Sequence, residues 1–302
     1  MSRVYSFQYG GQAVIEGVMM RGPALCSVAV RRPDNTIVLR KNPVGSLANK
    51  YPWLKWPFLR GLVVLIESLI MGIEALTYSA NQAMEEEEGE ISSFALALTV
   101  LVALVLAIFL FIVLPTGLTH YLVNQGWSSL AQNLVEGVIR LVVFLGYVVI
   151  ISRMPDIKRV FQYHGAEHKV INAFEAGKEI VVSNVKPYST FHPRCGTSFL
   201  LIVLVISIFL FSLLGQQVLW WRIVSRVLFL PVLAGISYEL LKFTARYPDF
   251  FFCRVIMAPG RWLQSLTTNE PDEAQIEVAI SALQAVLEED KDRQDSCLVS
   301  IQ

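Results

Sequence analysis

The chain has 302 residues, of which 54% are hydrophobic and only 17% are charged, and its 25 basic residues balance its 25 acidic ones. Soluble globular proteins carry about 25% charged residues, so this composition indicates an integral membrane protein. The zero net charge gives no electrostatic support to nucleic-acid binding, and four scattered cysteines do not make a disulfide framework.

Residues 1–57 are predicted to form a cytoplasmic segment of glycine-marked turns and one β-hairpin. Glycines at positions 10, 11, 17 and 22 indicate turns or close backbone approaches. Two short β-rich runs, 26–31 and 36–40, flank a Pro-Asp-Asn turn, which is a hairpin pattern. Glu16 and Arg21 are the charged residues of the glycine-rich part, and a solvated surface loop is the first interpretation for both.

Residues 58–78 carry apolar side chains at helical spacing, interrupted by Arg60, Glu67 and Glu74. Carboxylates are costly in hydrocarbon. The pattern therefore favours an interfacial or half-buried helix, and it leaves open whether this segment crosses the membrane.

Four later stretches reach the length of about 20 apolar residues that crosses a bilayer. The first two stretches, 93–114 and 133–152, lie within a predicted transmembrane region 93–152. The other two, 198–219 and 223–243, make up a second predicted transmembrane region, 198–243. Pro231 is expected to kink the last stretch. Glu136 and Arg140 have the i, i+4 spacing of an ion pair along one helix, and Glu239 is expected to pair with Lys242 or Arg226.

The basic residues predict the orientation. Nine Lys and Arg precede the first long stretch, seven lie in the loop 153–197, and none lies in 117–132. By the positive-inside rule, both termini and the loop 153–197 are cytoplasmic, in a multi-pass protein of the inner (plasma) membrane. The tail 244–302 is cytoplasmic and contains an amphipathic helix over 269–290. The predicted fold is mostly α, a polytopic helical membrane protein with about four transmembrane helices and a small cytoplasmic β-hairpin and helix domain.

Two of the four histidines, His164 and His168, are four residues apart with Glu167 between them. On a helix, side chains at i and i+4 share a face and can reach one metal ion. The order His-x-x-Glu-His is that of a reversed zinc-peptidase motif, in which the Glu is the general base. His192 and Cys195 follow within one polar loop and complete a set of zinc ligands.

The pattern leaves three interpretations open. If all four residues bind zinc or another divalent metal, the site is closed and structural. If three bind, the site is hydrolytic, with Glu167 as base and Lys169 or Arg194 stabilising an oxyanion. Otherwise the histidines are ordinary surface residues and the cysteine a small buried one. Glu239 is a further candidate for a polar contact beside the metal.

Three segments resemble the signatures of the YqhQ-like family of bacterial and plastid membrane proteins. They are Gly-Gly-Gln-Ala-Val-Ile-Glu-Gly-Val-Met-Met-Arg at 10–21, His-Gly-Ala-Glu-His-Lys at 164–169 and His-Pro-Arg-Cys-Gly-Thr-Ser at 192–198. The resemblance covers roughly residues 9–259. It implies a predicted metal-dependent enzyme of no established substrate, and it places the glycine-rich start in the functional core, which adds Glu16 and Arg21 to the residues around the site.

The favoured hypothesis is a membrane-embedded zinc hydrolase that acts on a membrane-associated peptide or a lipid-linked substrate. The alternative is a non-enzymatic scaffold or assembly factor whose metal is structural, with a transporter third. The expected partners are the lipid bilayer and a membrane-associated substrate or protein. The sequence leaves the oligomeric state open, including a homo-oligomer.

Overall fold

The computed structural model describes residues 9–45, 50–56, 59–84, 92–123, 126–215, 218–247 and 249–299, with side chains up to residue 291. The described chain is mostly helical and contains a four-stranded antiparallel sheet. The strands are β1 Gly10–Val14, β2 Gly17–Arg21, β3 Leu25–Arg31 and β4 Ile37–Pro43, paired in the order β1-β2-β3-β4. The helices before the metal motif are η1 Pro52–Lys55, α2 Leu59–Ala83, α3 Ser93–Ile108, η3 Phe109–Val113, α4 Leu114–Leu122 and α5 Ser129–Ile151. The later helices are α6 Pro155–Glu175, α7 Val182–Val185, α8 Gly196–Ser212, α9 Leu219–Leu228, α10 Leu230–Arg246, α11 Phe251–Thr267 and α12 Glu273–Val299.

The predicted hairpin is confirmed, since β3 and β4 pair in antiparallel register from Arg31 opposite Ile37 to Leu25 opposite Pro43. The glycine-rich segment differs from its prediction as a loop, because it forms the hairpin β1–β2 with Gly10 opposite Arg21. The turn between these strands holds Glu16 at φ 51°, a left-handed conformation that few side chains adopt.

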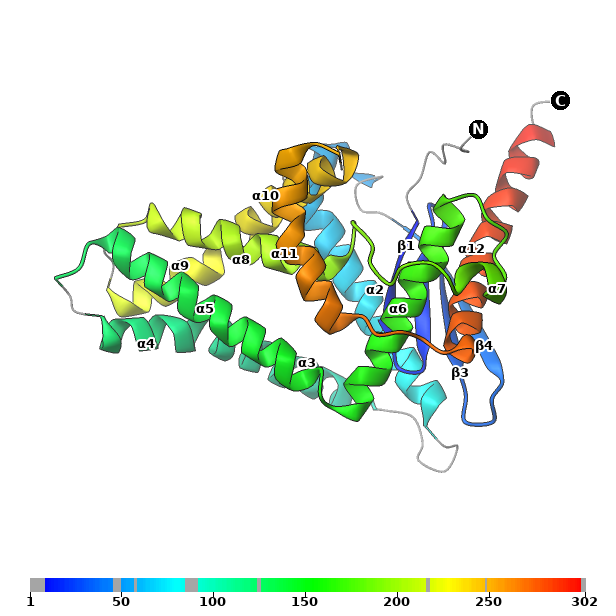
Figure 1. Ribbon diagram of the computed structural model, residues 1–302, viewed down its shortest axis with the longest axis horizontal. Coiled ribbons are helices and arrows are strands. Elements are labelled where there is room, and N and C mark those ends of the chain that lie inside the picture. The colour runs from blue at the N-terminus through cyan, green and yellow to red at the C-terminus, as the bar shows by residue number, and fades with distance from the viewer. Residues whose placement is uncertain are drawn as a thin grey trace.

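The sheet is covered on both faces. Val18, Met20 and Ala29 pack with α6 and α12 on one face. Met19 and Val28, on the other face, pack against α2. The amphipathic tail helix is thus confirmed in α12, whose apolar side contributes to the same core as α6. Figure 1 shows α6 and α12 beside the sheet at one end of the molecule.

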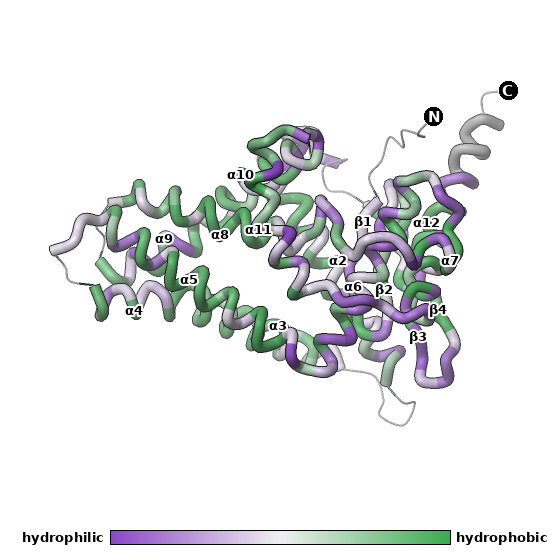
Figure 2. The backbone as a smooth tube through the Cα atoms, viewed as in Figure 1, coloured by the Kyte–Doolittle hydropathy of each residue, from purple (hydrophilic) through white to green (hydrophobic). Residues whose placement is uncertain are grey.

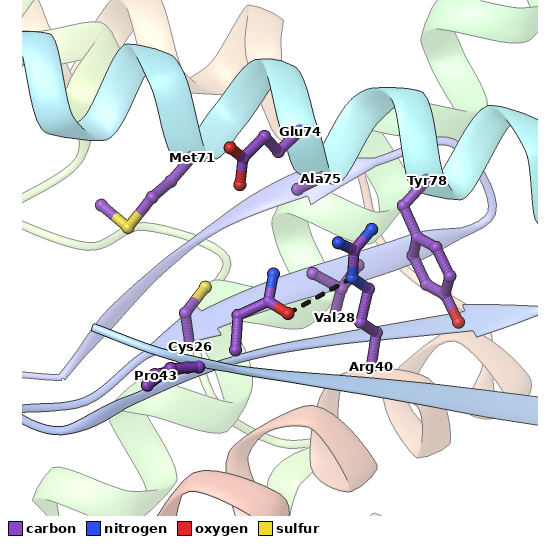
Figure 3. A pocket seen from close by; sticks show the side chains of 9 residues that line it. Cys26, Val28, Arg40, Pro43, Met71, Glu74, Ala75 and Tyr78 are labelled. Atoms are coloured by element: carbon purple, nitrogen blue, oxygen red, sulfur yellow. Dashed lines mark hydrogen bonds between the residues drawn. The ribbon is translucent and has the colours of Figure 1, made fainter. Parts of the chain in front are cut away.

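A cavity of about 60 Å³ lies between α2 and the sheet (Figure 3). Cys26 and Arg40 of the sheet and Glu74 and Tyr78 of α2 are among its lining residues. Because α6 packs on the opposite face of the sheet, this cavity is separate from the His-x-x-Glu-His helix.

The remaining helices form an arm that projects from the sheet, with α3, α4, α5, α8 and α9 along it (Figure 1). Hydrophobic residues run along α3, α5 and α8, whereas hydrophilic residues gather around α6 and the sheet (Figure 2). Among the described residues, Ser93–Leu122 and Ser129–Ile151 are long and apolar enough to cross a membrane by length and composition. The pair α9–α10, bent by 44°, is a third candidate if it counts as one span, and α8 is a shorter apolar helix.

Two local predictions can be compared with this arm. The kink at Pro231 is confirmed as a break at Phe229, with the proline in the first turn of α10. The first long stretch was expected to end at Pro115, but its helix continues to Leu122 through the π-helical turn η3. Segment 58–78 corresponds to α2, which carries a buried Glu67, packs on the sheet and is not among the candidate spans.

Candidate metal centre

The helix α6 carries the His-x-x-Glu-His motif beside the sheet. It starts with Pro155 in its first turn and ends before Gly177, whose φ of 70° suits a glycine that terminates a helix. Between these ends α6 is unbroken, so His164 and His168 lie one turn apart on one face, with ring centroids 4.4 Å apart.

Both histidine rings are oriented by backbone carbonyls. The Nδ1 atom of His164 lies 2.8 Å from the Thr267 carbonyl oxygen, at the end of α11, and Nδ1 of His168 lies 2.5 Å from the Thr190 carbonyl oxygen. A carbonyl can only accept, so each Nδ1 donates its proton. In the neutral ring Nε2 is then left with a free lone pair, the state of a metal-binding imidazole.

Cys195 brings a third ligand atom to the two histidines. Its Sγ lies 3.3 Å from His164 Nε2 and 3.2 Å from Thr197 Oγ1. The ligand atoms of His164, His168 and Cys195 all lie within 4.8 Å of one another. Zinc–nitrogen and zinc–sulfur bonds of 2.0–2.3 Å in tetrahedral geometry separate neighbouring ligand atoms by roughly 3.5 Å. The three atoms therefore fit one zinc ion after small shifts.

Cys195 is held at this point because it is the residue before the first turn of α8. Two imidazole nitrogens and a thiolate form a donor set that zinc accepts.

His192, the fourth predicted ligand, lies beside this group and is 4% exposed. Its ring centroid is 5.7 Å from that of His168. Its Nε2 is buried without a hydrogen-bond partner, because the nearest carboxylate oxygen, Glu175 Oε2, is 3.6 Å away. Burial, as the largest cause, lowers the pKa of His192 and keeps it in the neutral, ligating form. His192 does not belong to the group of three ligand atoms, so its role as a fourth ligand stays a prediction.

The loop that carries His192 is fixed by Gln264 of α11. The Gln264 side chain accepts from the His192 backbone N–H at 3.0 Å and donates to the His192 carbonyl at 3.0 Å and to Ser198 Oγ at 2.9 Å. Gln264 is 1% exposed, so these bonds are shielded from water. Sequence reasoning missed Gln264 and the carbonyls of Thr190 and Thr267, because nothing in their residue types marks them.

Gly165 allows the chain after α11 to reach the histidine helix. A Cβ at this position would lie 2.1 Å from the Asn269 carbonyl oxygen. The Asn269 backbone N–H donates to the Phe161 carbonyl at 2.9 Å. Gly165 thus leaves space for the segment after α11, close to the Thr267 carbonyl that orients His164.

Glu167 points toward the first strand of the sheet and is 5% exposed. Burial raises its pKa to about 7, while His164 and the Gly11 backbone N–H act in the opposite direction. A Cβ on Gly11 would lie 3.2 Å from the Glu167 carboxyl carbon, so the glycine leaves room for the acid. Its carboxylate does not belong to the group of three ligand atoms. Its role as a base stays a prediction.

The two residues added by the resemblance form ion pairs around the sheet. Glu16 is paired with the Arg159 guanidinium, and its Oε2 lies 3.2 Å from the Tyr163 hydroxyl on the metal-motif helix. Arg21 lies 3.4 Å from Glu67 of α2. Glu16 is therefore tied to the start of the helix that carries the histidines.

Lys169, Arg194 and Glu239 are likewise paired. The Lys169 ammonium lies 2.6 Å from the Glu270 carboxylate. Arg194 pairs with Glu175, the same carboxylate that faces His192. Glu239 pairs with Arg60 of α2, with Nε to Oε1 at 2.6 Å, which corrects the expected pairing with Lys242 or Arg226. The sequence does not predict this ion pair, because Arg60 lies 179 positions before Glu239.

Comparison with known proteins places the chain in a family. Residues 56–289 match the family described as "Protein of unknown function (DUF1385)". The chain is 38% identical over 292 residues to the "Uncharacterized protein YqhQ" of Bacillus subtilis (strain 168), and the alignment covers 92% of each protein. No solved structure matches the chain. Neither description names a metal or an activity, so the metal-dependent-enzyme label is unsupported by these matches. On the family match and the 38% identity, the chain belongs to the DUF1385 family.

Proposed function

We propose that the protein is a membrane protein that holds zinc, or another divalent metal, at its cytoplasmic face and uses it to hydrolyse a membrane-associated peptide or lipid-linked substrate. The observation that carries this proposal is the convergence of His164, His168 and Cys195, with both imidazoles oriented by carbonyls. A bound zinc ion supplies Lewis acidity to water and to the substrate carbonyl.

The chain's own groups supply the other parts of the reaction. Glu167, in the middle of the motif, accepts the proton of the attacking water and is shielded from bulk solvent. Arg194 lies in the ligand loop itself, two residues after His192, and offers positive charge for a developing oxyanion. Its pairing with Glu175 is the contact that substrate has to replace.

We also propose that the chain crosses the membrane four times and that the metal loop is cytoplasmic. The membrane spans are supported by side chains that are apolar where exposed and charged where buried. Phe94 of α3 is 78% exposed and Trp220 of α9 is 65% exposed, whereas Arg226 of α9 is 2% exposed. Apolar surface outside and charge inside is the arrangement expected in lipid. The spans are Ser93–Leu122, α5, α8 and the bent pair α9–α10.

His192 supports a second candidate function, a structural metal site in a scaffold or assembly factor. Its ring lies beside that of His168, and its Nε2, 3.6 Å from Glu175 Oε2, has no hydrogen-bond partner. If it closes the coordination sphere, the metal clamps the loop to α6 and no position is left for water.

Metal content of the detergent-purified protein tests the centre. Wild type is compared with His164→Ala, Cys195→Ser and His120→Ala, a matched control because His120 lies on α4. We expect about one zinc per chain in wild type and in His120→Ala, and loss of zinc in the other two. Absence of metal from wild type after zinc is added back would refute both functions.

Cobalt substitution separates the two functions. In the hydrolase, an azide ion enters the open position and changes the visible spectrum of the cobalt protein. In the structural site, azide changes the spectrum only after His192→Ala. Glu167→Gln provides a second distinction, because the hydrolase keeps its metal and its thermal midpoint but loses its cellular function, whereas a scaffold keeps all three.

A further inference from the structure

A second group of charged side chains lies in the arm, away from the metal centre. Arg140 of α5 and Arg222 and Arg226 of α9 all donate to the carboxylate of Glu136, at 2.7, 2.6 and 3.0 Å. None of the four residues is more than 5% exposed. These four residues are called the arginine cluster below.

The arginine cluster has more positive than negative charge. Three guanidinium groups face one carboxylate, which leaves an excess of 3 − 1 = +2. The helices η3, α4, α5, α8 and α9 contain no other acidic residue, and Glu239 of α10, which also packs on α8 and α9, is paired with Arg60. An excess of buried positive charge is unfavourable in an apolar surrounding. Binding of an anion would therefore reduce the excess positive charge of the cluster.

Neutral groups satisfy hydrogen bonds in the cluster without balancing its charge. Arg140 Nε donates to the Phe111 carbonyl at 2.9 Å, and Arg226 Nη2 donates to Asn133 Oδ1 at 2.7 Å. The Phe111 carbonyl is available because Pro115, four residues later, has no N–H to give it. The π-helical turn and the proline of the first span thus serve to hold an arginine.

The cluster lies near the end of the arm that is remote from the sheet. Arg222 is in the first turn of α9, directly after Trp220 and Trp221, and Trp127 lies just before α5. All three tryptophans are exposed, at 65%, 39% and 50%. Tryptophans concentrate at the membrane–water interface. Figure 1 shows α4, α5 and α9 meeting at this end. The guanidinium groups are therefore within a few turns of the depth at which lipid phosphates lie.

We propose that the arginine cluster binds the phosphate group of an anionic ligand, with Arg222 as the principal donor to the phosphate oxygens. Planar guanidinium groups match phosphate in paired hydrogen bonds. The phosphate belongs either to a phospholipid head group of the adjacent leaflet or to a soluble phosphate. The lipid source uses the membrane orientation proposed above, whereas phosphate binding is independent of the metal and of any hydrolytic function.

Binding to the full-length protein in a neutral detergent tests the proposal. The probes are phosphatidylglycerol, phosphatidylcholine with the same acyl chains, and inorganic phosphate, each followed by native mass spectrometry and by the thermal midpoint. We expect wild type to retain phosphatidylglycerol in preference to phosphatidylcholine. If inorganic phosphate alone binds, the ligand is soluble; if it does not displace phosphatidylglycerol, the ligand is the lipid. Equal retention of both lipids together with no phosphate binding would overturn the proposal.

Substitutions locate the binding. Arg222→Gln is expected to weaken binding by about tenfold or more, because a charge-assisted hydrogen bond is lost. Arg254→Gln makes the same charge change at an exposed position of α11, outside the cluster, and is expected to bind like wild type. Glu136→Gln raises the excess charge to +3 and is expected to strengthen binding, whereas a purely structural ion cluster predicts only destabilisation. If Arg222→Gln does not fold, Arg222→Lys keeps the charge, loses the paired geometry and is expected to bind more weakly than wild type. Unchanged binding in the folded Arg222 variant would refute the site.

Discussion

Substitution of Gly165 by alanine tests whether the backbone geometry around His164 is what forms the metal centre. An added Cβ would lie 2.1 Å from the Asn269 carbonyl oxygen, whereas ordinary contacts begin at 3.4 Å. The segment after α11 therefore has to retreat by 3.4 − 2.1 = 1.3 Å. The Thr267 carbonyl, two residues earlier, is now 2.8 Å from His164 Nδ1. A retreat of that size makes the distance about 4 Å, which is no longer a hydrogen bond.

Gly165→Ala changes the free energy of unfolding through two unfavourable effects and one smaller favourable effect. Overpacking costs about 1–3 kcal/mol, and each lost hydrogen bond costs about 1 kcal/mol. Alanine is favoured over glycine inside a helix by about 1 kcal/mol. The net expectation is a destabilisation of about 1–3 kcal/mol. Loss of the group that orients a ligating histidine lowers metal affinity by about 10- to 100-fold.

Zinc affinity is measured by competition with a chromophoric chelator, and the thermal midpoint is measured in the same detergent. Gly196→Ala is the matched control, because Gly196 adjoins the ligand Cys195 and its added Cβ would meet no atom within 4 Å. Equal zinc affinities for Gly165→Ala and Gly196→Ala would refute the role assigned to the carbonyl of Thr267.

Two further substitutions separate the ligand loop from the sheet domain. Gln264→Leu leaves the buried N–H of His192 unpaired and its carbonyl with only the 3.4 Å bond from the Cys195 N–H. We expect a loss of about 1–3 kcal/mol in stability and a lower zinc content; an unchanged thermal midpoint would contradict this. Tyr9→Phe removes the 2.7 Å hydrogen bond from the tyrosine hydroxyl to the Asp290 carboxylate. We expect a loss of about 1–2 kcal/mol with full zinc content, and a fall in zinc would show that the two regions are coupled.

Several elements could be predicted because one local pattern decided each of them. The Pro-Asp-Asn turn predicts the β3–β4 hairpin, and the apolar spacing of the tail predicts α12. The glycine-rich hairpin β1–β2 could not be predicted in this way. Four of the five residues of β2 are buried, because helices cover both faces of the sheet, so the alternation that marks a half-buried strand is absent.

In the candidate site, too, only the features set by local spacing could be predicted from the sequence. The spacing of His164 and His168 gives their shared face from helix geometry alone, and that prediction is confirmed. The groups that orient them are carbonyls, which every residue possesses, so no residue type marks Thr190 or Thr267. The position of His192 depends on how Gln264, 72 residues later, holds the loop.

The proposed metal centre and the arginine cluster contact α8 at two separate points, so each can be tested without disturbing the other. Cys195 directly precedes α8, and Ser207 of the same helix accepts a hydrogen bond from Arg140 at 3.3 Å. Twelve residues at 1.5 Å each separate these points by about 18 Å. Loss of the metal is expected to loosen the first turn of α8, whose capping residue is the thiol ligand. The arginine cluster is held instead by α5 and α9, through bonds that do not pass through that turn. A Cys195→Ser protein that has lost zinc should therefore still prefer phosphatidylglycerol, and an Arg222→Gln protein that has lost this preference should still hold its zinc.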